Sequence, residues 1–163
     1  MKKYFIYIFL LFNLTVNLFA ELVSATDFEL KDQYKIEHNL EKYRGKKVFV
    51  VFWNTWCGYC TEELKDIEKL YEKTGENKKD IIFLTFNNEE ADVLQEVLKE
   101  RGYKFPVMND EIIFYKYYID GVPTLYVINE DGKVVQSIVG QIERENLEKL
   151  IENQYYKIEE KKE

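Results

Sequence analysis

The order of apolar and polar residues predicts an alternation of buried strands and helices. Residues 48–53 are β-branched and aromatic without polar alternation, which is typical of a strand buried on both faces of a sheet. Apolar residues then recur at helical spacing until Gly75, so one helix is expected over residues 58–73, with Gly75 ending it. Residues 80–86 repeat the pattern of a buried strand.

A second helix is expected after this strand. Asn87 and Glu90 have the spacing of a capping box, in which two side chains satisfy free backbone N–H groups at a helix start, and Gly102 is placed to end the helix. The order strand, helix, strand, helix implies parallel pairing through right-handed crossovers. We therefore predict an α/β fold with helices on both faces of the sheet.

Shorter elements are expected on either side of this unit. Residues 27–30 and 34–37 alternate apolar with polar positions, which predicts a short edge hairpin. Asp131-Gly132 is a strong hairpin turn signal between two strands, residues 123–128 and 133–139. The remaining expected elements are an extended piece at residues 105–108, a short helix at residues 112–118, and a final amphipathic helix with Leu147, Leu150 and Ile151 on its inner face.

The N-terminal stretch has the three parts of a secretory signal peptide. Basic Met1-Lys2-Lys3 precede the apolar residues 4–12, and a more mixed stretch ends at the small residue Ala20. The alternative is an uncleaved membrane anchor, although the unbroken apolar run is shorter than the ~20 residues that span a bilayer. We therefore expect an exported, periplasmic or extracytoplasmic protein, soluble after cleavage or tethered by its N-terminal segment.

Length and charge narrow the class of protein. The 163 residues suit one domain, expected over residues 21–156, between the signal peptide at residues 1–20 and a charged tail at residues 157–163. The net charge of −7 becomes −9 without the signal peptide, which holds two lysines and no acids. An acidic surface argues against nucleic-acid binding. We expect a monomer.

The chemistry is concentrated in two cysteines, Cys57 and Cys60, the only ones in the chain. They lie where the first buried strand meets the first helix, and a bond between them closes a loop too short to stabilise the fold much. His38 is the only histidine and is interpreted as a surface residue, so the chain offers no set of zinc ligands and no metal or other cofactor is expected. We interpret the pair as a redox dithiol that alternates with a disulfide.

The position of the pair assigns a role to each sulfur. The partial positive charge and free N–H groups of a helix N-terminus stabilise a thiolate on Cys57 and lower the thiol pKa from its usual ~8.5. Cys57 is therefore the expected nucleophile. Cys60 lies within reach of the Cys57 sulfur but points further into the fold, so it can resolve the mixed disulfide that Cys57 forms with a substrate.

These residues resemble the thioredoxin-like fold and, within it, the exported TlpA/ResA-like thiol-disulfide oxidoreductases. The resemblance spans roughly residues 27–155 and is carried by residues 50–60, by residues 121–124, and by Asp131-Gly132-Lys133 with Gly140. It implies a three-layer α/β fold with a central mixed sheet, helices on both faces and an N-terminal β extension. It also implies that Pro123 is cis beside the cysteines and that the substrate contacts the residues Trp56, Gly58, Tyr59, Val122 and Pro123.

Three positions bear on how far the resemblance extends. Thioredoxin has a buried aspartate as proton acceptor where this chain has Val51. ResA-like proteins carry a glutamate where Glu63 stands, and a partly desolvated carboxylate there can shuttle a proton for Cys60. The alternative is that Glu63 is an ordinary acid in the first turn of a helix. Lys65 replaces a proline of relatives, which leaves the local geometry of the helix open.

The resemblance implies a reductase of client-protein disulfides. Its electron donor would be a membrane-embedded thiol transporter of the CcdA or DsbD kind, and its clients apocytochrome c or an oxidised methionine sulfoxide reductase. Two alternatives stay open: a disulfide oxidase or isomerase with the same cysteines, and a non-catalytic adaptor that uses the fold for binding.

Overall fold

The computed structural model describes residues 22–153. The predicted signal peptide at residues 1–20 and the predicted charged tail at residues 157–163 lie outside the described residues. Between residues 22 and 153, no helix is both long enough and apolar enough to cross a membrane.

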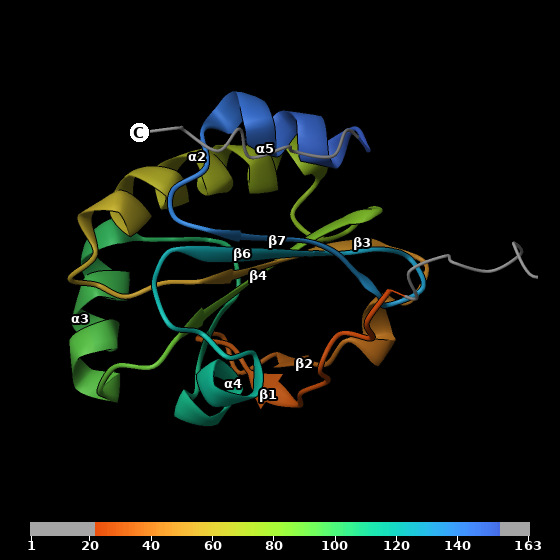
Figure 1. The fold of residues 1–163 in the computed structure, drawn as a ribbon. Coiled ribbons are helices and arrows are strands. Elements are labelled where there is room, and N and C mark those ends of the chain that lie inside the picture. Colours follow the sequence, from red (N-terminus) through yellow and green to blue (C-terminus); the bar gives the residue numbers. More distant parts are fainter. Residues whose placement is uncertain (1–21, 154–163) are drawn as a thin grey trace, which may run out of the picture.

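A five-stranded mixed sheet forms the centre of the molecule, with strand order β5-β4-β3-β6-β7 (Figure 1). The strands β3, β4 and β5 are parallel, whereas β6 pairs antiparallel with both β3 and β7. All six residues of the central strand β3 are buried: five belong to the predicted apolar run, and the sixth, Lys47, precedes it. The strands are β3 Lys47–Phe52, β4 Ile81–Asn87, β5 Val107–Asn109, β6 Thr124–Ile128 and β7 Val134–Val139.

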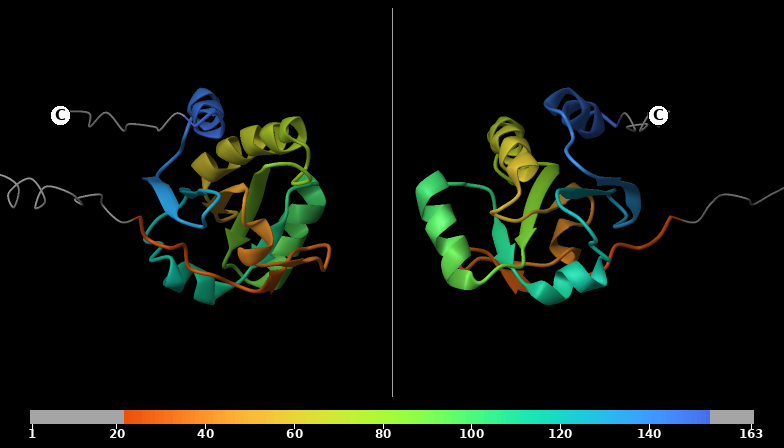
Figure 2. Two further views of the ribbon diagram at one scale, coloured as in Figure 1. Left: turned by 90° about the vertical axis from the view of Figure 1, so that its right-hand side faces the viewer. Right: turned by 60° about the vertical axis from the view of Figure 1, so that its left-hand side comes forward.

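Helices cover both faces of this sheet, which confirms the predicted three-layer fold. In Figures 1 and 2, α2 and α5 lie over one face, α4 and the N-terminal segments lie under the other, and α3 flanks the edge near β5. The predicted first helix is α2, which Gly75 ends in the left-handed conformation. The helices are α2 Gly58–Thr74, α3 Ala91–Arg101, α4 Glu111–Lys116 and α5 Arg144–Ile151, with a 3-10 turn η1 at Glu41–Tyr43.

Side chains along β3 point alternately to the two faces of the sheet, and each face has its own hydrophobic core. Phe49 and Val51 face the core under α2 and α5, which also contains both cysteines. Val50 and Phe52 face the second core, against α4 and the N-terminal segments. The cysteines are therefore part of the packed interior on the α2 side.

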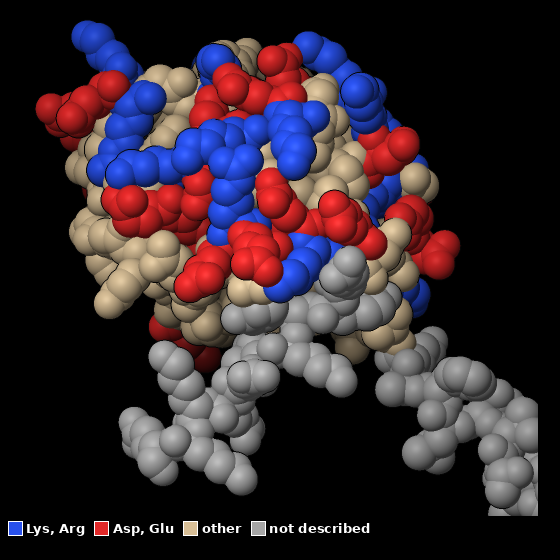
Figure 3. All heavy atoms as spheres, turned by 90° about the horizontal axis from the view of Figure 1, so that it is seen from above, with Lys and Arg blue, Asp and Glu red and all other residues tan. Residues whose placement is uncertain are grey.

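The surface above α2 and α5 carries both signs of charge. Figure 3 shows Lys and Arg interleaved with Asp and Glu over this face. Ion pairs account for much of the mixture, for example Lys69 with Asp66 at 3.0 Å and Lys73 with Glu148 at 3.1 Å. Exposed pairs of this kind contribute little stability, and their alternation leaves this face without a large region of one sign.

The predicted capping box at Asn87 and Glu90 is wrong. Glu90 occupies the position before α3 and makes no capping hydrogen bond with its side chain. Asn87 is the last residue of β4 and is fully buried. The strand β4 therefore ends one residue later than predicted. The side-chain amide of Asn87 donates to the carbonyl of Trp53 at 3.2 Å and so supports the end of the neighbouring strand.

The expectation that His38 lies on the surface is also wrong. The predicted hairpin exists as β1 Leu30–Lys31 and β2 Glu37–His38, and it forms the N-terminal β extension. His38 is only 5 % exposed, with Nε2 3.0 Å from Asp32 Oδ2 and Nδ1 2.5 Å from the Tyr43 hydroxyl. Its ring pairs with two polar side chains that are brought together by the hairpin and the η1 turn. Over residues 22–153, no group of three or more His, Cys, Asp or Glu side chains is arranged to hold a metal ion.

Candidate active site

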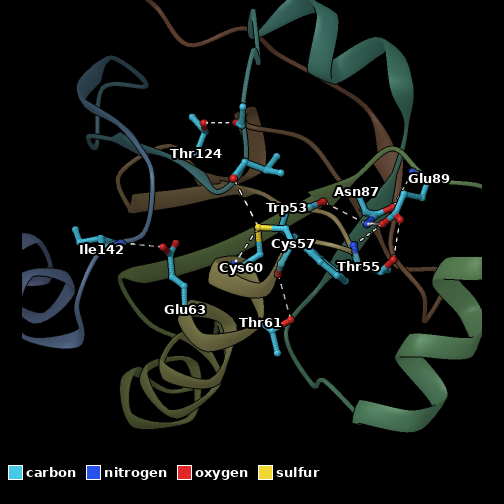
Figure 4. Close-up of a disulfide and its surroundings, with 12 residues drawn as sticks. Trp53, Thr55, Cys57, Cys60, Thr61, Glu63, Asn87, Glu89, Thr124 and Ile142 are labelled. Atoms are coloured by element: carbon cyan, nitrogen blue, oxygen red, sulfur yellow. Dashed lines mark hydrogen bonds between the residues drawn. A yellow bond between two sulfur atoms is a disulfide. The ribbon is translucent and has the colours of Figure 1, made fainter.

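The two cysteines lie where β3 delivers the chain to α2, and they are joined in a disulfide with a Cα–Cα distance of 5.2 Å. Cys57 is the N-cap residue of α2, and Cys60 lies in its first turn. Both are largely buried, at 5 % and 1 % exposure, whereas Trp56 and Tyr59 beside them are each 71 % exposed. Two exposed aromatic residues therefore adjoin a disulfide that is barely open to solvent. Figure 4 shows the two sulfurs at the start of α2.

The helix start places a hydrogen-bond donor on the first sulfur. The backbone N–H of Cys60 points at Cys57 Sγ at 3.1 Å. The first N–H groups of a helix have no partner within it, so after reduction this group stabilises a thiolate on Cys57. The roles of Cys57 as nucleophile and of Cys60, the more buried sulfur, as the resolving thiol stay predictions.

A loop containing a cis peptide lies beside Cys57. The bond Val122-Pro123 is cis, as the resemblance implies, and the carbonyl oxygen of Val122 lies 3.6 Å from Cys57 Sγ. Two hydrogen bonds hold the loop: Gly140 N–H donates to the Pro123 carbonyl at 2.8 Å, and Thr124 Oγ1 donates to the Gly121 carbonyl at 2.7 Å. These two hydrogen bonds thus hold the backbone next to the reactive sulfur in place.

Glu63 is buried on the same helix, at 1 % exposure, three residues after Cys60. Its Oε2 accepts a hydrogen bond from the Ile142 backbone N–H at 2.9 Å (Figure 4), while Oε1 has no partner within the part of the chain that the structure describes. Burial raises the pKa of this carboxyl to about 7, and the Ile142 bond lowers it only in part. The neighbouring Glu62 is exposed and pairs with Lys65, so the two adjacent acids have different environments.

Comparison with known proteins shows which family the chain belongs to. The family model described as Redoxin matches residues 22–151. The chain belongs to the Redoxin family. The thiol-disulfide oxidoreductase ResA of Geobacillus kaustophilus is 35 % identical over 133 residues, covering 80 % of this chain and 75 % of that protein. The chain is thus a ResA-like thiol-disulfide oxidoreductase, and the adaptor alternative is set aside.

Solved structures agree with this assignment. A putative thiol:disulfide interchange protein DsbE from Chlorobium tepidum has a TM-score of 0.74 at 25 % identity, covering 82 % of this chain and 96 % of that one. The exposed lipoprotein thioredoxin Etrx1 of Streptococcus pneumoniae has a TM-score of 0.71 at 26 % identity, covering 78 % and 99 %. The described domain therefore has the thioredoxin-like fold.

In this ResA-like domain, Val51 is fully buried and apolar among the core residues around the cysteines. The strand side of the disulfide therefore has no carboxylate at the position where thioredoxin has one. Glu63 is the buried carboxylate on α2, and its role as a proton shuttle stays a prediction. Lys65 is exposed within α2, which continues unbroken from Gly58 to Thr74 in the absence of the proline of relatives.

A further acid at this site was missed by sequence reasoning. Glu89 follows β4 and accepts three hydrogen bonds: from the backbone N–H of Thr55, from Thr55 Oγ1 at 2.7 Å and from Asn87 Nδ2 at 2.8 Å. It thereby ties the loop between β3 and Cys57 to the end of β4 (Figure 4). The available signal was an acid two residues beyond a buried strand, next to the strand that carries the cysteines.

Proposed function

We propose that this oxidoreductase works outside the cytoplasm as a reductase of disulfides in client proteins. The Cys57 thiolate attacks one sulfur of the client disulfide, whose S–S bond breaks, and the departing thiolate takes up a proton. The Cys60 thiolate then attacks Cys57 Sγ, which releases the second client thiol and forms the Cys57–Cys60 disulfide. Two electrons pass from the dithiol to the client. The observation that carries this proposal is the Cys60 N–H directed at Cys57 Sγ, since it activates the attacking sulfur.

The second step requires that Cys60 lose its proton in a buried setting. A buried thiol ionises reluctantly, so a nearby base accelerates its attack. Glu63 suits this role because its pKa of about 7 lets it both accept and release a proton near neutral pH. The unpaired Oε1 leaves one oxygen of the carboxylate available to take the proton.

The direction of electron flow depends on how strongly the fold stabilises the Cys57 thiolate. Strong oxidants of this fold stabilise their reduced form, which raises the reduction potential. Here the described hydrogen bonds to Cys57 Sγ include one backbone N–H and no Lys, Arg or His side chain. The Val122 carbonyl, 3.6 Å away, turns a negative dipole toward the sulfur. Weak stabilisation of the thiolate favours a reductase over the alternative of an oxidase or isomerase.

The cysteines need a source of electrons and a client. We propose a membrane thiol transporter of the CcdA or DsbD kind as donor and an apocytochrome c or an oxidised methionine sulfoxide reductase as client, with the backbone of Val122 pairing with the client chain. The signal-like N-terminal stretch supports export, as does similarity to a protein named as an exposed lipoprotein.

Two measurements test the proposal. Equilibration with glutathione gives the reduction potential, and we expect it well below about −150 mV, whereas a value near or above this would favour the oxidase or isomerase. The variant Cys60→Ala should hold the mixed disulfide on Cys57, and mass spectrometry of the trapped species identifies the client. Cys57→Ser should trap nothing and should lose insulin reduction.

A further inference from the structure

A groove leads away from the reactive cysteine along the loop before Val122. Its inner part is bordered by Trp56 and Val122, and it continues past Phe114 and Ile119 into a hollow of about 450 Å³ against α4. The two parts share four lining residues, Asn88, Phe114, Ile119 and Asp120, so they form one continuous depression. A chain segment bound next to Cys57 can therefore extend into the hollow without leaving the surface.

The outer wall of the groove is an exposed apolar face of α4. Ile112, Tyr115 and Tyr118 are 64 %, 85 % and 86 % exposed, and Tyr115 and Tyr118 line the hollow. By contrast Ile113 and Tyr117 of the same segment do not line the groove and are buried in the core. The core thus takes one side of this segment, while the side toward the groove carries large apolar rings with no intramolecular cover.

Tyr118 occupies a backbone position that favours glycine. Its φ is +53°, and it follows α4 with hydrogen bonds from Tyr118 N–H to Tyr115 O at 3.1 Å and from Ile119 N–H to Phe114 O at 3.0 Å. This is the helix-ending arrangement in which glycine is the usual residue. A bulky side chain there costs about 1 kcal/mol. The ring is exposed and gives the fold little packing in return, which points to a role in binding.

The charges lining the groove have one sign over most of its length. Glu111 and Asp120 line it between α4 and the cis-peptide loop, and neither belongs to an ion pair among residues 22–153. Lys116 borders only the outer end, beside Ile112. An occupant that carries Lys or Arg next to an apolar side chain would complement both features.

We propose that this groove binds the client polypeptide next to its reacting cysteine and selects segments that combine an aromatic or aliphatic residue with Lys or Arg. The inference rests on the proposed function, since it places the client's disulfide at Cys57. The apolar side chain of the client lies against Tyr115 and Tyr118, and its cation lies near Asp120 and Glu111. The selected step is the first one, in which Cys57 attacks the client sulfur.

Synthetic peptides test this selectivity. Each carries one cysteine activated as a disulfide with nitrothiobenzoate, a coloured leaving group. Reduced Cys60→Ala attacks the peptide sulfur, forms the Cys57–peptide disulfide and releases the coloured thiolate. Four kinds of flanking segment are compared: an apolar residue with a basic one, alanine with a basic residue, an apolar residue with an acidic one, and alanine with an acidic residue. Each segment is placed either before or after the cysteine. We expect the apolar basic peptide to react about tenfold faster than the alanine acidic one, and the advantage of basic peptides to shrink at high salt.

Variants locate the preference on the groove. Tyr118→Gly should slow the apolar basic peptide about fivefold while leaving the melting temperature unchanged or higher, because glycine relieves the left-handed backbone. Glu111→Gln with Asp120→Asn should remove the preference for basic peptides. The matched control is Val93→Ala with Glu96→Gln on α3, an exposed apolar residue and an exposed acid away from the groove lining, which should change neither rate.

The small disulfide of N-acetylcysteine amide with nitrothiobenzoate distinguishes a failure of the groove proposal from a failure of the proposed function. If the protein reacts with this compound but equally with all the peptides, the groove proposal fails and the thiol chemistry stands. If it reacts with neither, the proposed function itself fails and the groove proposal with it. If Tyr118→Gly leaves the peptide rates intact and instead abolishes a dimer seen by sedimentation, the face of α4 joins two copies of the chain and the groove proposal is overturned.

Discussion

The carboxylate of Glu63 meets the backbone N–H of Ile142 at 2.9 Å, in the segment between β7 and α5. The two residues are far apart in sequence, yet the contact is the single described hydrogen bond to the carboxyl group within residues 22–153. The proton affinity of Glu63 therefore depends on how the C-terminal part of the domain closes over α2.

Stability of the oxidised protein should fall as pH rises, because of Glu63. Burial raises its pKa in the folded state to about 7, above the 4.5 of an ordinary exposed glutamate. Below the lower value both states hold the proton, and between the two values only the folded state does, so stability is lost as pH rises to about 7. The loss is on the order of 3 kcal/mol. Urea unfolding of Glu63→Gln should lack this decline, and an equal decline in the variant would refute the assignment.

Glu63→Gln should also slow the resolving step. Without the carboxylate, Cys60 must lose its proton to water, and we expect the release of a bound client thiol to slow by about 10²-fold. Stopped-flow measurement of release from a preformed mixed disulfide, as a function of pH, isolates this step. The control is Glu62→Gln, an exposed neighbour on the same helix. Equal pH profiles for the two variants would count against a proton role for Glu63.

Glu89→Gln should loosen the loop before Cys57. The amide cannot accept all three hydrogen bonds that the carboxylate receives from Thr55 and Asn87, so we expect a loss of about 1–3 kcal/mol in the free energy of unfolding. Chemical denaturation measures it. The matched control is Glu90→Gln, which alters an exposed acid without a described side-chain bond to this loop. An unchanged stability for Glu89→Gln would mean that the contacts to Thr55 are not needed to hold the loop.

His38→Ala should destabilise the domain without changing its redox properties. The substitution removes the partner of buried Asp32 and leaves space beside Tyr43, for a cost of about 2–4 kcal/mol. Because the hairpin lies away from the cysteines, the equilibrium with glutathione should be the same in wild type and variant under conditions where both are folded. A shifted reduction potential would show that the hairpin communicates with the disulfide.

Sequence predicted most of what depends on local pattern. The unbroken apolar run identified β3, the helical spacing before Gly75 identified α2, and the cysteine spacing gave the redox pair its place at the helix start. These features follow from residues adjacent in the chain, where periodicity and turn chemistry decide the outcome.

The misses involve contacts or backbone conformations that exist only in the folded chain. His38 looked like a lone polar residue, because nothing near it in sequence indicates that the hairpin and η1 would enclose it. Asn87 fitted a local capping motif, but its amide is used by the adjacent strand end and by Glu89. Tyr118 gave no signal either, since its strain exists only in the folded backbone.

The unequal exposure of Cys57 and Cys60 also limits what the protein can become attached to. Cys60 is 1 % exposed and held within the first turn of α2, so a client sulfur can reach only Cys57. In the proposed reductase cycle, each molecule therefore carries one client at a time, and attack by Cys60 on Cys57 releases that client. In that proposed cycle, a shortage of electrons from the donor leaves the protein with its Cys57–Cys60 disulfide and no bound client, and not as a mixed disulfide.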